Sequence, residues 1–216
     1  MEWPPVTLST QPIDAYARAL ASVDPTPGGG SASAVVGALG ASLAAMVARL
    51  TAASPKFAPV AARMNAIADE AMQLFDAMLV AIDADVKEFD RVSAAYKLPK
   101  STDAEKTART TAIQGALIGA TDAPMKVVEL GLTLARLAVE LVDAGNPNAI
   151  SDAGCAALLA QTAARGASLN VRINIKALHD AELARVYQTK LDDLLAQIGL
   201  LTEVAIVKVE RATRLV

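Results

Sequence analysis

The feature that most constrains this chain is an uncharged run over residues 25–48, "PTPGGGSASAVVGALGASLAAMVA". The run is long enough to span a bilayer, but alanine, glycine and serine dominate it, so its transfer into lipid is weak compared with that of a leucine-rich segment. A helix that is small and apolar on every side is typical of one surrounded by other helices. We therefore expect a buried helix, central in the fold or at a subunit interface, and no membrane span.

The rest of the sequence predicts an all-α fold, a single-domain bundle of long antiparallel helices over residues 1–216. Apolar residues recur at helical spacing, and no alternating β-branched run appears between the turn signals. The expected helices span residues 11–22, 31–53, 58–97, 103–143, 152–178 and 180–213, with a break in the fourth near Pro124. "STDAEK" predicts a capping box where the fourth helix begins.

Composition and charge exclude several classes of function. The single cysteine, Cys155, and the single histidine, His179, form no cluster that suits zinc or an iron–sulfur centre, so we expect no metal and no cofactor. A net charge of -3 without a basic block argues against nucleic acid or an anionic membrane as the main partner. The start "MEWPPVTLST" lacks the pattern of a secretory signal, and we expect a reduced, cytoplasmic compartment.

Asp85 is the most informative single residue, because it lies on the apolar face of its predicted helix. At about 100° per residue, "EAMQLFDAMLVAIDADVKEFDRVSAAY" gathers its large apolar side chains, Phe89 and Tyr96 among them, on one face. Asp85 projects from this face, whereas Asp83 points to the polar one. A buried carboxylate with a raised pKa suits a general acid or base. The alternative is structural: Asp85 caps a neighbouring helix or pairs with a buried arginine.

Two further groups of residues have both a functional and a structural interpretation. "GGGS" at residues 28–31 lacks the lysine of a phosphate loop, but its backbone N–H groups at a helix start can bind an anion or a polar ring. The alternative is a glycine-rich turn that permits close packing. Asn170 and Asn174 lie one helical turn apart among apolar residues, which indicates specific hydrogen bonds for both amides.

Several motifs follow one another along nearly the whole chain: "PTPGGGSASAVVGALGASLAAMVARLT", "DADVKEFDRV", "YKLPKSTDAEK", "ATDAP", "GNPNAISDAG" and "LNVRIN". Together they resemble the cyclodeaminase/cyclohydrolase family of folate enzymes. The resemblance implies an all-helical homodimer, a tetrahydrofolate substrate and no metal, with Asp85 as the acid/base carboxylate. It also implies a set of substrate-binding candidates, namely Gly28, Gly29, Gly30, Ser31, Lys56, Asn146, Asp152, Asn170 and Asn174.

The resemblance implies one of two folate reactions. We expect hydrolysis of 5,10-methenyltetrahydrofolate to 10-formyltetrahydrofolate, with formiminotetrahydrofolate cyclodeaminase as the alternative and an inactive helical ligand-binding or assembly protein as the remoter one. After "LT" the family usually continues with a glycine and a pair of lysines, whereas this chain reads "AASPKF" and keeps only Lys56. No separate formiminotransferase domain is expected, because the cyclodeaminase-like domain fills the 216 residues.

Overall fold

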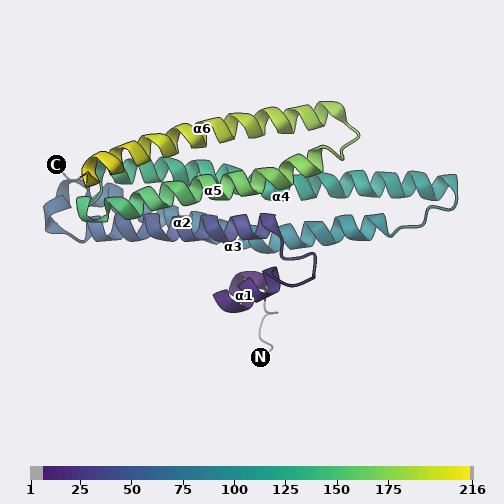
Figure 1. The fold of residues 1–216 in the computed structure, drawn as a ribbon, viewed down its shortest axis with the longest axis horizontal. Coiled ribbons are helices and arrows are strands. Elements are labelled where there is room, and N and C mark those ends of the chain that lie inside the picture. The colour runs from purple at the N-terminus through teal and green to yellow at the C-terminus, as the bar shows by residue number, and fades with distance from the viewer. Residues whose placement is uncertain (1–6, 215–216) are drawn as a thin grey trace.

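The computed structural model describes residues 7–214, which form six α-helices and no strand (Figure 1). The helices are α1 at Ile13–Leu20, α2 at Gly29–Ala52, α3 at Ala61–Tyr96, α4 at Asp103–Ala144, α5 at Ile150–Ile175 and α6 at Ala181–Thr213. Short 3₁₀ helices lie at Leu8–Thr10, Pro55–Val60 and Pro147–Ala149. The all-α prediction is confirmed, and each predicted helix is present with ends shifted by a few residues.

The helices α2 to α5 form an antiparallel bundle around one core. α2 packs against α3 and α5, and α4 packs against the same two helices, so α2 and α4 occupy opposite corners. α6 packs on the outer side of α4 and α5. At one end the α3–α4 hairpin extends past the other helices (Figure 1). The start of α2 therefore lies part-way along α3 rather than at its end.

α2 is the buried helix of small residues that the uncharged run predicts. Ala34, Ala41 and Ala44 are 0% exposed. A Cβ at Gly37 would lie 2.6 Å from Cε of Met78 on α3, so the absence of a side chain leaves room for the end of Met78 between the two helices. By length and composition α2 could cross a membrane, but 61% of its most apolar window is buried inside the bundle. Its small side chains thus serve helix packing.

Pro124 does not break α4, which is continuous over Asp103–Ala144. Proline lacks an N–H group, so the carbonyl of Ala120, four residues earlier, loses its partner within the helix. Nδ2 of Asn174 on α5 donates a hydrogen bond to this carbonyl at 2.5 Å. The predicted break is wrong because a side chain from a neighbouring helix supplies the missing hydrogen bond.

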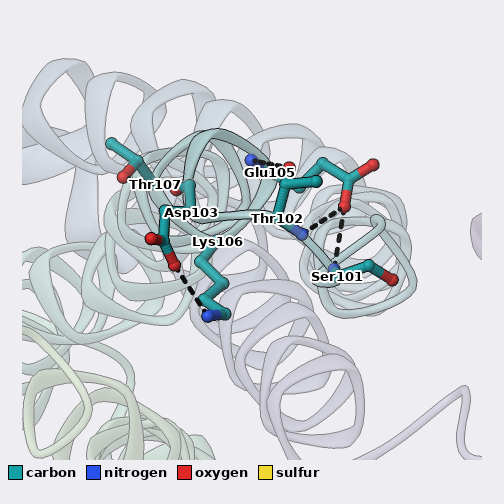
Figure 2. A network of polar contacts seen from close by, with 6 residues as sticks. All are labelled: Ser101, Thr102, Asp103, Glu105, Lys106 and Thr107. Carbon is teal, nitrogen blue, oxygen red and sulfur yellow. Dashed lines mark hydrogen bonds and ion pairs between the residues drawn. The ribbon is translucent and has the colours of Figure 1, made fainter.

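The predicted capping box at the start of α4 is confirmed (Figure 2). Oγ1 of Thr102 accepts a hydrogen bond from the N–H of Glu105 at 3.2 Å. The Glu105 carboxylate accepts from the N–H groups of Thr102 and Ser101 at 2.9 and 2.8 Å, and these bonds lower the pKa of Glu105. Lys106 pairs with Asp103 at 2.8 Å. This network fixes where α4 begins and therefore how far the α3–α4 hairpin extends.

Candidate functional site

The candidate site lies where the first turn of α2 meets α3. Gly28 is the N-cap residue of α2 and has no side chain to cap the helix. Oδ2 of Asp85 on α3 instead accepts a hydrogen bond from the N–H of Ser31 at 2.9 Å. Asp85 therefore caps a neighbouring helix, which is one of the two structural roles that the sequence leaves open. The other N–H groups in this first turn have no carbonyl partner within the helix, and N–H groups in such a position can bind an anionic or polar ligand.

Gly30 makes room for the Asp85 carboxylate. A Cβ at Gly30 would lie 2.1 Å from Oδ1 and 2.6 Å from Cγ of Asp85. Both distances are shorter than any non-bonded approach, so a residue with a side chain would displace the carboxylate. The lack of a side chain at Gly30 thus allows the carboxylate to lie against the backbone of α2.

Burial raises the pKa of Asp85, and the hydrogen bond from the Ser31 N–H lowers it in part. Among residues 7–214, no lysine or arginine forms an ion pair with this carboxylate, so the second structural alternative, a buried arginine partner, is not observed. The side chain is half-buried and keeps some contact with solvent. A partly accessible carboxylate with a raised pKa has the properties of a general acid or base near neutral pH.

Tyr16 on α1 belongs to the same cluster, although the sequence does not indicate it. Its hydroxyl lies 2.9 Å from Oγ of Ser31, and the two residues are 7% and 0% exposed. Burial raises the pKa of Tyr16, and the charge of Asp85 raises it further against the opposing effect of the Ser31 hydrogen bond. The Ser31 side chain, predicted to face the substrate, is therefore buried against Tyr16, and only its backbone N–H reaches the Asp85 carboxylate.

Asn170 on α5 lies on the other side of the first turn of α2. Its Nδ2 would be 3.4 Å from a Cβ on Gly29, and it donates a hydrogen bond to the Gly166 carbonyl at 3.3 Å. A primary amide carries a second donor hydrogen and an acceptor oxygen, so Asn170 retains groups that can bind a ligand. The structure thus brings Asp85, Asn170 and residues 28–30 together, as the sequence predicts.

Two other polar residues near this region have structural partners. Asn174, predicted to bind substrate, donates to the Ala120 carbonyl that Pro124 leaves free. Asp83, predicted to lie on a solvated face, is half-buried and accepts hydrogen bonds from the Ser9 hydroxyl at 2.6 Å and the Ser9 N–H at 3.4 Å. It anchors the 3₁₀ helix that precedes α1.

The remaining predicted residues lie at the opposite end of the bundle. The N–H of Asn146 donates to Oγ1 of Thr51 at 2.9 Å, near the last residue of α2 and about 30 Å along that helix from Gly30. Asp152 is in the first turn of α5, and Lys56 is in the 3₁₀ helix that follows α2. Within one chain, these three candidates do not join the Asp85 cluster.

A family model described as formiminotransferase-cyclodeaminase matches residues 12–193. The chain belongs to this family. The resemblance that the motifs indicate is therefore confirmed. The all-helical bundle, in which Asp85 of α3 caps the start of α2, is the fold of this family member.

Similarity to individual family members extends over most of the chain. It is 42% identical over 191 residues to the methenyltetrahydrofolate cyclohydrolase of Methylorubrum extorquens, a match that covers 88% of this chain and 92% of that protein. It is 32% identical over 194 residues to the formimidoyltransferase-cyclodeaminase of Rattus norvegicus, of which it spans 36%. The crystal structure of formiminotetrahydrofolate cyclodeaminase from Thermotoga maritima matches with a TM-score of 0.86 at 28% identity, over 94% of this chain and 98% of that one.

Proposed function

We propose that this protein is a cytoplasmic enzyme of folate one-carbon metabolism that hydrolyses 5,10-methenyltetrahydrofolate to 10-formyltetrahydrofolate without a metal or cofactor. The observation that carries the proposal is the Asp85 carboxylate, which is partly accessible, has a pKa raised by burial and lies beside the start of α2. Hydrolysis is supported over deamination by the cyclohydrolase of Methylorubrum extorquens, because this chain is 42% identical to it but only 28% and 32% identical to the Thermotoga maritima and rat relatives.

The proposed reaction needs one group that accepts a proton and returns it. The oxygen of water bonds to the cationic methenyl carbon between N5 and N10 while Asp85 accepts a proton from that water. Asp85 then gives the proton to N5 as the bond between the carbon and N5 breaks. The remaining hydroxyl proton leaves to solvent as the formyl C=O forms on N10. The negative charge of Asp85 also stabilises the delocalised cation before water adds.

The cyclodeaminase reaction is the second candidate, because the Thermotoga and rat relatives are named for it. In that reaction N10 attacks the formimino carbon of 5-formiminotetrahydrofolate, whose imino nitrogen is already protonated, and ammonia leaves as the cationic methenyl bridge closes. The same carboxylate can accept the N10 proton and deliver it to the departing nitrogen. We propose that Asn170, whose Nδ2 lies beside Gly29, and the N–H groups of residues 28–30 orient the reacting groups in either reaction.

The function is tested by mixing the purified protein with each folate and following the methenyl chromophore. Loss of the chromophore from 5,10-methenyltetrahydrofolate above the spontaneous rate is the expected result. Its appearance from 5-formiminotetrahydrofolate would establish the cyclodeaminase instead. A protein that is folded and accelerates neither reaction would contradict both enzymatic proposals and favour the ligand-binding or assembly role.

The proposal includes a homodimer formed through α2. An apolar stripe runs along the outward side of this helix, where Leu39, Met46 and Leu50 are 48%, 37% and 50% exposed and Val36 and Leu43 are half-buried. A continuous apolar surface of this kind is typical of a subunit interface. Ala41, which is 0% exposed, faces the core, so a charge at that position would test the fold rather than the interface.

Leu39→Glu is therefore the substitution that tests the dimer. It places a charge on the outer stripe of α2, at the exposed side chain nearest the start of the helix, where a partner copy would bury the charge without a counter-ion. Light scattering should show the mass fall from twice 22.3 kDa to 22.3 kDa with the helical circular dichroism retained. Val80→Glu, at an isolated side chain of α3 that is 70% exposed, is the control and should leave the mass unchanged. A Leu39→Glu protein that is still dimeric would exclude this interface.

A further inference from the structure

The face of α3 that packs against α2 continues beyond Asp85, where no residue of α2 lies opposite it among the described residues 7–214. Phe89, Val92 and Tyr96 follow Asp85 on this face at helical spacing, but α2 begins only at Gly29, opposite Asp85. Phe89 is 42% and Tyr96 49% exposed. The part of the predicted apolar stripe that α2 covers therefore ends at Asp85, and Phe89 and Tyr96 beyond it are exposed. Val92, between them, packs against the apolar cluster of Ala95, Ile113, Ala116 and Leu117 where α3 meets α4. Phe89 and Tyr96 are called the free face of α3 below.

The free face begins beside the reactive carboxylate and ends beside a fixed cation. The helical rise places Phe89 about 6 Å and Tyr96 about 16 Å from Asp85 along the axis. Nε and Nη2 of Arg109 on α4 donate to the Tyr96 carbonyl at 3.2 and 3.0 Å. The guanidinium also lies 5.4 Å from the centre of the Tyr96 ring. A ligand that extends along this face meets a carboxylate, an aromatic side chain and a cation in that order.

We infer that the free face of α3 binds the aminobenzoylglutamate portion of the substrate, with its ring on Phe89 and its glutamate carboxylates toward Arg109. The inference rests on the proposed function. In a tetrahydrofolate the aminobenzoyl ring is bonded to N10, which flanks the reacting carbon, and the glutamate is attached at the far side of that ring. A reacting carbon at Asp85 thus places an aromatic ring within reach of Phe89, where ring stacking is favourable, and the anionic end toward the guanidinium.

The free face is also compatible with a second copy of the chain, because an exposed apolar surface can be an interface. Two observations favour the substrate. The face is continuous with the candidate catalytic carboxylate on a single helix, and its far end carries a cation that suits an anionic ligand. The proposed dimer surface, the outer stripe of α2, lies on a different helix.

Phe89→Ala tests the inference. Loss of the Phe89 ring should raise the KM for 5,10-methenyltetrahydrofolate about tenfold, because the substrate loses a stacking partner. The kcat should change by less than about threefold, since the Phe89 ring takes no part in the proton transfers. The fragment p-aminobenzoylglutamate should bind the wild-type protein in calorimetry, and Phe89→Ala and Arg109→Gln should each weaken this binding several-fold. Val80→Ala, on the outer side of α3, is the matched control and should change neither quantity.

The fragment separates this inference from the proposed function, because its binding requires no turnover. Normal KM and normal fragment binding in Phe89→Ala, with an active wild-type protein, would overturn the inference and leave the function standing. Absence of turnover in the wild-type protein would overturn the function, and fragment binding that depends on Phe89 would still support the subsite. Dissociation of Phe89→Ala into monomers by light scattering would assign the free face to a second copy instead.

Discussion

Asp85→Asn is expected to lower turnover about 100-fold or more while the protein remains folded. Asparagine has no basic carboxylate, so it cannot accept a proton from water. Its Oδ1 can still accept the hydrogen bond that the Ser31 N–H donates to Asp85 at 2.9 Å. The cap on α2 therefore survives, and the free energy of unfolding should change by less than about 1 kcal/mol. Steady-state rates and thermal melts measure the two effects separately.

Asp76→Asn is the matched control, because it makes the same chemical change at an exposed position of α3 and should be neutral. Asp83→Asn would be a poor control, since the Asp83 carboxylate accepts a hydrogen bond from Ser9.

Wild-type kcat/KM should fall as the pH drops through the raised pKa of Asp85, because only the ionised form accepts a proton. Near-normal turnover in Asp85→Asn, with the same acid limb as the wild-type protein, would exclude Asp85 as the acid/base group.

Gly30→Ala is expected to reduce turnover about 100-fold, although it adds a single methyl group and changes no charge. The new Cβ would lie 2.1 Å from Oδ1 of Asp85, so the carboxylate must rotate away and lose the hydrogen bond from Ser31. Stability should change little, because alanine favours the helix by about 1 kcal/mol over glycine and offsets the lost cap. The measurement is kcat alongside the melting temperature.

Gly115→Ala in α4 makes the same substitution where no atom lies within 4 Å of the new Cβ. It should retain full activity and stabilise the protein by about 0.5 to 1 kcal/mol. If Gly30→Ala were as active as this control, the position of the Asp85 carboxylate against α2 would not matter to the reaction. A loss of activity in both variants would point instead to a general effect of stiffer helices.

The helices and their approximate ends follow from local signals, but the continuity of α4 does not. Spacing of apolar residues and the "STDAEK" capping box depend on neighbours a few positions apart, which a sequence displays directly. Pro124 is tolerated because Asn174, far along the chain, donates to the Ala120 carbonyl. A hydrogen bond between distant segments does not appear in the spacing of apolar residues along the sequence. The proline alone therefore predicts a break in the helix.

The centre of the site is also predictable, because Asp85 interrupts an apolar face of its own helix. The residues around Asp85 are harder to predict from the sequence. Tyr16 reaches Ser31 across a turn, and nothing in the residues between them indicates the contact. Asn146 and Asp152 belong to a family motif, and Lys56 lies where the chain departs from the family pattern, but neither observation tells at which end of a long helix a residue lies. Helix length and direction decide that, and they separate these residues from the site within one chain.

The hydrogen bond between Asp85 and the first turn of α2 has a consequence for protein engineering. Helix ends are the usual places to gain thermostability, since a better capping residue rarely disturbs chemistry. Here the capping group of α2 and the proposed proton carrier are one carboxylate, and it is supplied by another helix. A serine or threonine at position 85 would remove the proposed proton carrier and leave only a shorter capping side chain. A capping side chain at position 28 would compete with Asp85 for the same N–H groups. Improvements to this fold are better sought at the other helix ends.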